Sequence, residues 1–279
     1  MAELLLLIAG GSAAGAFGAL LGLGGGVLIV PLLTLGFGLP LRQAIGASLV
    51  CVIVTSSAAA SVYLQRDVAN LRLGMTFEMF TALAALAGGL VAFALPDRAL
   101  ALMFAALLLY VAVTMARGRG PELAVKPTSK DAESRAPAPD EGAPGDGLAA
   151  SLSGPGYRVR NLGRGVLGSL LAGVVSALFG VGGGIVKVPL MNLAMGVPLR
   201  VATATSNLMI GVTASAGGLI YLLRGGIDPY VAAPLAVGVF AGASLASRVA
   251  DRVDLRLLRV LFVAVLVVTA SQMALKGIP

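Results

Sequence analysis

Gly22-Leu-Gly-Gly-Gly-Val-Leu-Ile-Val-Pro31 is the stretch of sequence that decides the fold of this chain. A near copy, Gly180-Val-Gly-Gly-Gly-Ile-Val-Lys-Val-Pro189, begins 158 residues later (180 minus 22). The same offset, without a gap, pairs further positions of the two halves: Pro40 to Arg42 with Pro198 to Arg200, Ser48 with Ser206, Thr55 with Thr213, Tyr63 with Tyr221, Arg66 with Arg224, Asn70 with Asp228 and Arg98 with Arg256. We therefore predict that one helical unit of about a hundred residues occurs twice, a pattern that in membrane chains is typical of secondary transporters.

The composition is that of a membrane protein. Hydrophobic residues make up 58% of the chain, the mean hydropathy is +0.96, and charged residues make up 12%, against about 25% in soluble domains. The net charge of +7 comes mostly from basic residues at segment ends and in a central linker. Basic residues in such places orient a protein in the membrane, so nucleic-acid binding is not supported. We predict an all-α polytopic membrane protein in contact with membrane lipid.

Two residue types limit the chemistry. Histidine is absent, and the one cysteine, Cys51, lies in an apolar run. This excludes His-based proton relays, cysteine metal sites and a Ser-His catalytic arrangement. We expect no enzymatic activity, no cofactor and no metal.

Residues 4–37 form an apolar run that is longer than one membrane crossing needs, since about 20 residues span the hydrocarbon core. The glycines at 22 and 24–26 should interrupt a helix there. The run then reads as two helical pieces joined by broken backbone, either a re-entrant hairpin or one crossing plus a shorter element. Small residues four apart, such as Gly11 and Gly15, suit close packing of helices in lipid.

The chain divides into three parts. Residues 1–118 form the first transmembrane repeat and residues 164–279 the second, which gives about 8 to 10 membrane segments in total. Residues 119–163 are rich in Pro, Ala, Gly and mixed charges and read as a flexible linker. Basic residues flank this linker, so we expect it in the cytoplasm.

The distribution of charge favours inverted repeats over parallel ones. Inversion with the linker inside places six cations in the cytoplasm: Arg66, Arg72, Arg200, Arg248, Arg252 and Arg256. It leaves four outside: Arg42, Arg98, Arg224 and Lys276. Parallel halves would leave six of these ten outside, against the positive-inside rule. Inversion requires an odd number of crossings per unit, either three plus a hairpin or five.

The two glycine motifs are candidate anion-binding elements. A helix that is broken inside the membrane exposes backbone N–H groups and a helix N-terminus, which attract an anion. The N-termini that follow the two motifs would converge across a pseudo-two-fold axis, near the midplane. The candidate residues are Gly24, Gly25, Gly26, Gly182, Gly183 and Gly184. The alternative is that these glycines serve only tight helix packing.

Lys187 is the strongest single candidate for a substrate-binding residue, because it lies in an apolar run and its repeat partner is Ile29. A cation within a membrane segment is costly and usually faces a cavity or a partner. Lys187 could supply positive charge to an anionic substrate, or it could pair with a carboxylate or reach the interface. Glu78 is the main buried-carboxylate candidate, and it could partner Lys187, carry a coupling proton or reach solvent.

Matched hydroxyl and amide side chains follow each motif. Hydroxyls can replace the water around an oxyanion without adding negative charge, although each alone is more typical of helix-to-helix hydrogen bonding. The candidate substrate-binding positions are Ser48, Thr55, Ser206, Asn207 and Thr213, and Ser57, Ser215, Thr203 and Thr205 belong to the same cluster.

The doubled glycine motif with Pro31 and Pro189, together with Ala-Thr-Ala-Thr-Ser206-Asn207, resembles the sulfite exporter TauE/SafE family, also described as the 4-toluene sulfonate uptake permeases. The resemblance covers nearly the whole chain except the linker, which is longer here than the family's usual connection. It implies a transporter of sulfite, sulfonates or related sulfur-containing anions in the bacterial inner membrane.

The leading hypothesis is therefore a secondary transporter of a small sulfur-containing anion that works by alternating access, with Glu78 available for proton coupling. A passive anion channel and a non-transporting membrane scaffold are the alternatives. A homo-oligomer is compatible with the small-residue stripes, which serve internal packing and dimer contacts alike.

Overall fold

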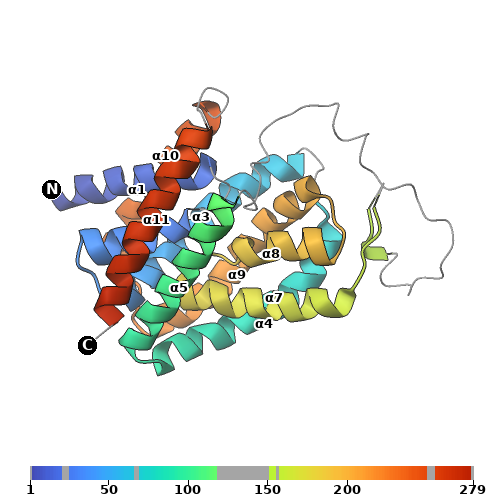
Figure 1. The fold of residues 1–279 in the computed structure, drawn as a ribbon, viewed down its shortest axis with the longest axis horizontal. Coiled ribbons are helices and arrows are strands. Elements are labelled where there is room, and N and C mark those ends of the chain that lie inside the picture. Colours follow the sequence, from blue (N-terminus) through green and yellow to red (C-terminus); the bar gives the residue numbers. More distant parts are fainter. Residues whose placement is uncertain are drawn as a thin grey trace.

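The computed structural model describes residues 2–20, 25–65, 69–117, 151–154, 157–249 and 255–277. All regular elements in these ranges are helices, and the β-type pairing there is limited to an isolated bridge between Gly154 and Tyr157. The first half contains α1 (Ala2–Leu20), α2 (Gly26–Pro31), the π-helical η1 (Leu32–Gly36), α3 (Leu41–Gln65), α4 (Leu71–Ala94) and α5 (Asp97–Ala116). The second half contains α7 (Leu162–Phe179), α8 (Gly184–Pro189), the π-helical η2 (Leu190–Ala194), α9 (Leu199–Leu223), α10 (Pro229–Val249) and α11 (Leu255–Gly277) (Figure 1).

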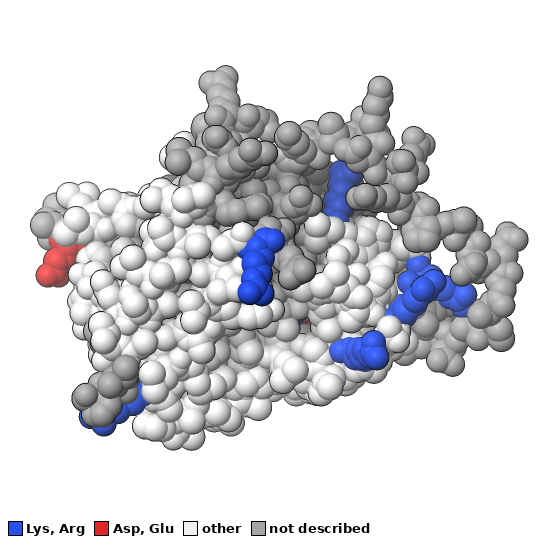
Figure 2. All heavy atoms as spheres, in the orientation of Figure 1, with Lys and Arg blue, Asp and Glu red and all other residues white. Residues whose placement is uncertain are grey.

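Six of the described helices are long and apolar enough to cross a membrane: α3, α4, α5, α7, α9 and α10. Shorter apolar helical stretches cover Glu3–Ala19, Gly26–Gly36, Gly184–Ala194 and Val260–Leu275. Large apolar side chains such as Leu83 and Leu219 are exposed, and uncharged residues form a broad surface on the face seen in Figure 2. The predicted all-helical polytopic membrane protein is confirmed.

The glycine motif breaks the helix in both halves, as the sequence predicts. Gly182 and Gly183 have φ of 79° and 74°, and Gly25 has φ of 76°, a left-handed conformation that favours glycine. In the second half the chain then turns back on itself. The backbone N–H of Arg160, before α7, donates to the carbonyl of Met195, after η2, at 3.1 Å. Helix α7 and the α8–η2 piece therefore form a helical hairpin whose outer ends lie together.

The first hairpin folds in the same way. A Cβ added to Gly25 would lie 3.6 Å from the carbonyl oxygen of Ala14. A Cβ added to Gly183 would lie 2.9 Å from the carbonyl oxygen of Ala172. Gly183 and Ala172 lie 158 positions beyond Gly25 and Ala14, so the two contacts are equivalent. In each half, the short helix therefore starts beside the middle of the helix that precedes it.

Glycines bring the backbones of α1 and α10 into direct contact. A Cβ on Gly11 would lie 2.6 Å from the carbonyl oxygen of Leu235, and a Cβ on Gly15 would overlap the carbonyl of Val239. The predicted packing role of the Gly11 and Gly15 pair is confirmed. Because both contacts advance together along the two sequences, α1 and α10 run in the same direction.

Helix α7, the first helix of the second half, packs on α4 of the first half in the same way. Gly165 and Gly173 of α7 lie against Phe77 and Thr81 of α4, so these two helices are also parallel. Helices α1 and α7, which open the two halves, run in opposite directions across Figure 1. Three long helices follow the hairpin in the first half, which is the odd number that inversion requires. The duplication and its inversion remain predictions from the sequence that this arrangement favours.

Arginines gather at the end of the bundle where α7 begins. The backbone N–H of Asn70, before α4, donates to Thr205 Oγ1 near the start of α9 at 2.9 Å, which brings the starts of these two helices together. The described cations at this end are Arg72, Arg158, Arg160, Arg164 and Arg200, with no acidic residue at this end among those that the structure describes. At the opposite end, Arg42 pairs with Asp97 at 3.1 Å. The positive-inside rule favours a cytoplasmic location for the arginine-rich end.

Gly242→Ala should destabilise the protein, because the added Cβ would overlap the carbonyl of Ser12 and push α1 away from α10. Overpacking of this kind costs about 1–3 kcal/mol. The measurement is the thermal unfolding midpoint of the purified protein in detergent. Gly163→Ala is the matched control, because nothing lies within 4 Å of the Cβ it adds. Equal midpoints for the two variants would contradict the close packing of α1 and α10.

Candidate functional site

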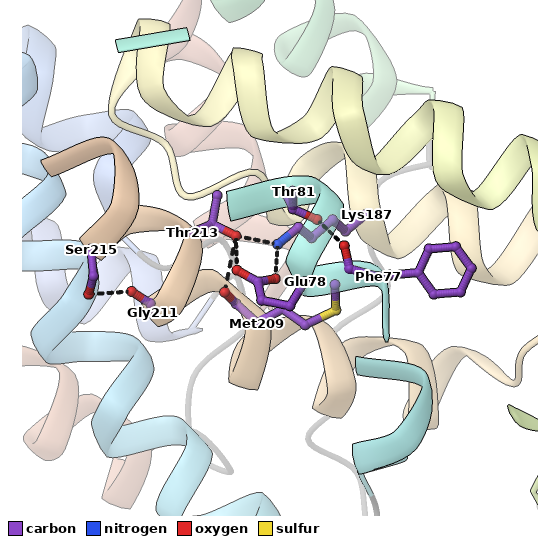
Figure 3. A network of polar contacts seen from close by, with 8 residues as sticks. All are labelled: Phe77, Glu78, Thr81, Lys187, Met209, Gly211, Thr213 and Ser215. Carbon is purple, nitrogen blue, oxygen red and sulfur yellow. Dashed lines mark hydrogen bonds and ion pairs between the residues drawn. The ribbon is translucent and has the colours of Figure 1, made fainter. Parts of the chain in front are cut away.

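Lys187 on α8, Glu78 on α4 and Thr213 on α9 form a polar cluster inside the protein (Figure 3). Lys187 Nζ donates to Glu78 Oε2 at 3.0 Å and to Thr213 Oγ1 at 2.6 Å. The Thr213 hydroxyl lies 2.5 Å from Glu78 Oε1, to which it donates. The ammonium and the carboxylate are thus joined both directly and through one hydroxyl, and the hypothesis that Glu78 partners Lys187 is confirmed.

The cluster is closed to solvent. Lys187 is 1% exposed, Glu78 is 7% exposed and Thr213 is fully buried. Among the residues that the structure describes, Lys187 and Glu78 are the only charged side chains that are buried. Burial of each ion costs several kcal/mol, and only a partner at hydrogen-bonding distance offsets that cost.

The break in the helix positions Lys187. The carbonyl oxygen of Gly183 accepts hydrogen bonds from the backbone N–H groups of Val186 at 3.1 Å and Lys187 at 3.0 Å, so α8 begins directly after the glycine motif. Lys187 therefore sits one turn from the break, facing α4 and α9. The Thr213 hydroxyl also lies 3.1 Å from the carbonyl oxygen of Met209, one turn earlier on its own helix.

The charged cluster has no charged counterpart at the positions equivalent to it by the repeat. At the 158-residue offset, Lys187 corresponds to Ile29, Glu78 to Ala236, and Thr213 to Thr55. Both Ile29 and Ala236 are buried and apolar. The second half therefore supplies the cation, α4 of the first half supplies the carboxylate, and the equivalent place across the molecule is uncharged.

Ser48 on α3 joins the tips of the two hairpins. Its hydroxyl lies 2.8 Å from the carbonyl oxygen of Gly180 and 3.2 Å from that of Gly26. A Cβ on Gly26 would lie 2.5 Å from the Gly180 oxygen, so the two glycine motifs touch each other inside the bundle. This contact joins the start of α2 to the end of α7, and the predicted convergence of two helix N-termini near the midplane stays a prediction.

The other predicted positions are distributed differently. Ser206 is buried, Asn207 is partly exposed, and the Thr55 hydroxyl donates to the carbonyl of Val52. Ser57 and Ser215 are exposed and donate to carbonyls of their own helices, so the structure does not bring them together with the buried positions. The structure thus brings together Lys187, Thr213 and Glu78 in one group and Ser48 with Gly26 in another; Gly25, Gly182, Gly183 and Gly184 line the motif turns, and Gly24 lies outside the described residues.

Sequence reasoning missed a second polar group, centred on Asn70. Asn70 Oδ1 accepts from the backbone N–H of Leu73 at 3.0 Å and so caps α4, while Nδ2 donates to Tyr157 Oη at 2.7 Å and to the Leu152 carbonyl at 2.9 Å. Leu152 and Val159 are buried against α4, η2 and α9, although the sequence placed them in a flexible linker.

Burial raises the pKa of the Tyr157 phenol, and the hydrogen bond from Asn70 opposes this shift. The phenol therefore stays neutral at neutral pH. An Asn directly before an apolar helical run is the signal that could have indicated the cap.

Broken intramembrane helices that touch at their tips, beside a buried ion pair, define a class of protein, because irregular backbone and charge inside a membrane protein are features of transport sites. The sequence model of the family described as "Sulfite exporter TauE/SafE" matches residues 7–273. The chain belongs to this family of membrane transporters.

Individual relatives agree with this assignment. A probable membrane transporter protein of Bacillus subtilis, YunE, is 25% identical over 98% of this chain and 98% of its own length. A probable membrane transporter protein of Methanocaldococcus jannaschii is 26% identical over 94% of this chain and 91% of its own length. Sulfite exporter TauE/SafE family protein 6 of Arabidopsis thaliana is 42% identical over 20% of this chain and 13% of its own length. No solved structure matches the chain.

Lys187→Met should lower the stability of the protein strongly, because it leaves Glu78 buried without a countercharge. Removal of one member of a buried ion pair costs about 3–5 kcal/mol, and we expect the double variant Lys187→Met with Glu78→Gln to lose less than the single one. Thermal unfolding in detergent measures both. Arg164→Met, which removes an exposed cation, is the control. A Lys187→Met variant that unfolds at the same temperature as this control would show that the pair is unimportant for stability.

Asn70→Ala should destabilise the arginine-rich end more than Tyr157→Phe does. The first change removes the α4 cap and both side-chain bonds to residues 152 and 157, whereas the second removes only the acceptor of one bond. A lost cap alone costs about 1 kcal/mol. Hydrogen exchange of residues 151–161 measures the effect, and faster exchange in Asn70→Ala is the expected result. Unchanged exchange in both variants would contradict the docking of this segment.

Proposed function

We propose that the protein is a secondary transporter that moves a small sulfur-containing anion, such as sulfite, a sulfonate or a sulfoacetate-like compound, across the bacterial inner membrane by alternating access. The buried Lys187, Thr213 and Glu78 cluster beside a broken helix is the observation that carries the proposal. Membership in the TauE/SafE family supports transport and supplies the sulfur-containing substrate class. We expect no enzymatic activity.

Charge balance in the cluster suggests how transport is coupled to protons. In the closed arrangement the two charges of Lys187 and Glu78 neutralise each other. An anion that binds to Lys187 adds negative charge where the dielectric constant is low and repulsion is strong. A proton taken up by Glu78 removes this excess as the anion replaces the carboxylate beside Lys187. One proton therefore moves with each negative charge that the site accepts.

The surrounding groups support this exchange. The Thr213 hydroxyl bonds to both members of the pair and can keep its bond to Lys187 when Glu78 becomes neutral. The glycine motifs supply backbone that can approach a bound anion without side chains in between. Helices α3 and α9, which carry Ser48, Thr55, Ser206 and Asn207, pack against each other at the centre of the two halves. Opposed movement of the halves about this contact would open the site to one side of the membrane and then to the other.

Uptake of labelled sulfite into proteoliposomes, with an imposed proton gradient, tests the proposal. We expect accumulation beyond the anion's own electrochemical equilibrium when the proton gradient points inward. Glu78→Gln should lose this gradient-driven accumulation, because residue 78 can no longer exchange a proton. Glu3→Gln, which removes an exposed carboxylate at the start of α1, should transport as the wild type does.

Two results would contradict the proposal. Flux that only follows the electrochemical gradient of the anion indicates a passive channel. Flux or binding that is unchanged in Lys187→Ala indicates that the cluster has a structural role and is not the substrate site.

A further inference from the structure

Most hydroxyl side chains on the described helices bond to a carbonyl of their own helix. Ser12, Thr34 and Thr81 donate to the carbonyl four residues earlier, and Ser56 and Thr114 to the one three residues earlier. Such a bond satisfies a hydroxyl that has no access to water. A buried hydroxyl without any partner is therefore unusual, and it requires an explanation.

Three buried hydroxyls have no hydrogen-bond partner among the described residues: Ser176, Thr203 and Ser206. Two of them lie beside the second glycine motif. The Ser206 hydroxyl would be 3.6 Å from a Cβ on Gly184, and the Ser176 Cβ would be 3.4 Å from a Cβ on Gly183. Ser176 is fully buried and Ser206 is 1% exposed. Two unpartnered donors from α7 and α9 therefore flank the same turn of backbone.

The equivalent place in the first half is built differently. Ser48 corresponds to Ser206, and its hydroxyl is satisfied by the carbonyls of Gly180 and Gly26. Ser176 corresponds to Gly18, which has no side chain to donate a bond. The unpartnered hydroxyls and the buried cation therefore occur at the same motif, since Lys187 follows the second glycine motif by one turn.

We propose that Ser176 and Ser206 are the hydrogen-bond donors of an oxyanion site at the second glycine motif, next to Lys187. This site is one-sided: Ser48, its symmetric counterpart, holds the hairpin tips together and does not bind substrate. The inference rests on the proposed function. It adds where the substrate binds and which side chains donate hydrogen bonds to it. An oxyanion suits the site because its oxygens accept hydrogen bonds, which both hydroxyls are free to donate.

Removal of either hydroxyl should weaken sulfite binding without lowering the stability of the free protein. Ser176→Ala and Ser206→Ala remove the donors and should each raise the Kd for sulfite about tenfold, equivalent to about 1.4 kcal/mol, the order expected for a hydrogen bond to a charged group. The same changes remove a buried hydroxyl that lacks a partner, so the unfolding temperature without ligand should stay the same or rise. Ser48→Ala should lower that temperature, because its hydroxyl bridges two carbonyls.

Titration calorimetry with sulfite, together with thermal unfolding in detergent, makes both measurements on the full chain. Ser56→Ala is the matched control, because Ser56 is buried on α3 and its hydroxyl is satisfied by the Ile53 carbonyl; it should bind sulfite as the wild type does. Wild-type affinity in both Ser176→Ala and Ser206→Ala overturns the inference and leaves the proposed function standing. A wild-type protein that binds none of sulfite, sulfoacetate and sulfate overturns the proposed function, and the inference with it.

Discussion

A positive charge inside a membrane protein must have a partner, and the contact of Lys187 with Glu78 and Thr213 meets this requirement here. The cation comes from α8, the carboxylate from α4 and the hydroxyl from α9. These helices lie far apart in the sequence and belong to both halves. Their arrangement depends on the break at Gly182 to Gly184, which starts α8 inside the bundle and not at its surface. The glycine motif, the helical hairpin and the ion pair therefore depend on one another.

The two halves share a framework but differ in what they place at its centre. Both contain the hairpin, the break and the parallel packing of their first helix on a helix of the other half. Among the described residues, a buried cation and carboxylate and the unpartnered buried hydroxyls occur on one side of this arrangement only. In the transport cycle that we propose, the shared framework opens the one charged site to either side of the membrane, and the substrate meets the same groups throughout. We regard this division between scaffold and site as the main feature of the protein.

The sequence predicted the framework well, because its signals are local. The apolar runs predict membrane helices, and the doubled glycine motif predicts the breaks. Which hydroxyls point into the protein could not be predicted, because this depends on how each helix is rotated about its axis. Thr213 and Ser215 lie two positions apart and so on nearly opposite faces of α9, one inside and one exposed.

Other features depend on contacts between distant segments. Asn70 meets Tyr157 across 87 residues, and the packing of Leu152 lies within a stretch whose composition is that of a linker. Ser176 has no polar equivalent in the first half, so the repeat that identified Ser206 could not identify it. Non-local packing decides these positions, and neither composition nor spacing reports it.

The central claim is that a bound anion takes the place of Glu78 beside Lys187 while Glu78 takes up a proton. Infrared difference spectroscopy of the membrane-embedded protein observes this step directly, because a protonated carboxyl has a carbonyl stretching band that a carboxylate lacks. We predict that sulfite induces such a band in the wild type and that Glu78→Gln abolishes it. Sulfite binding without a new protonated-carboxyl band would contradict the exchange.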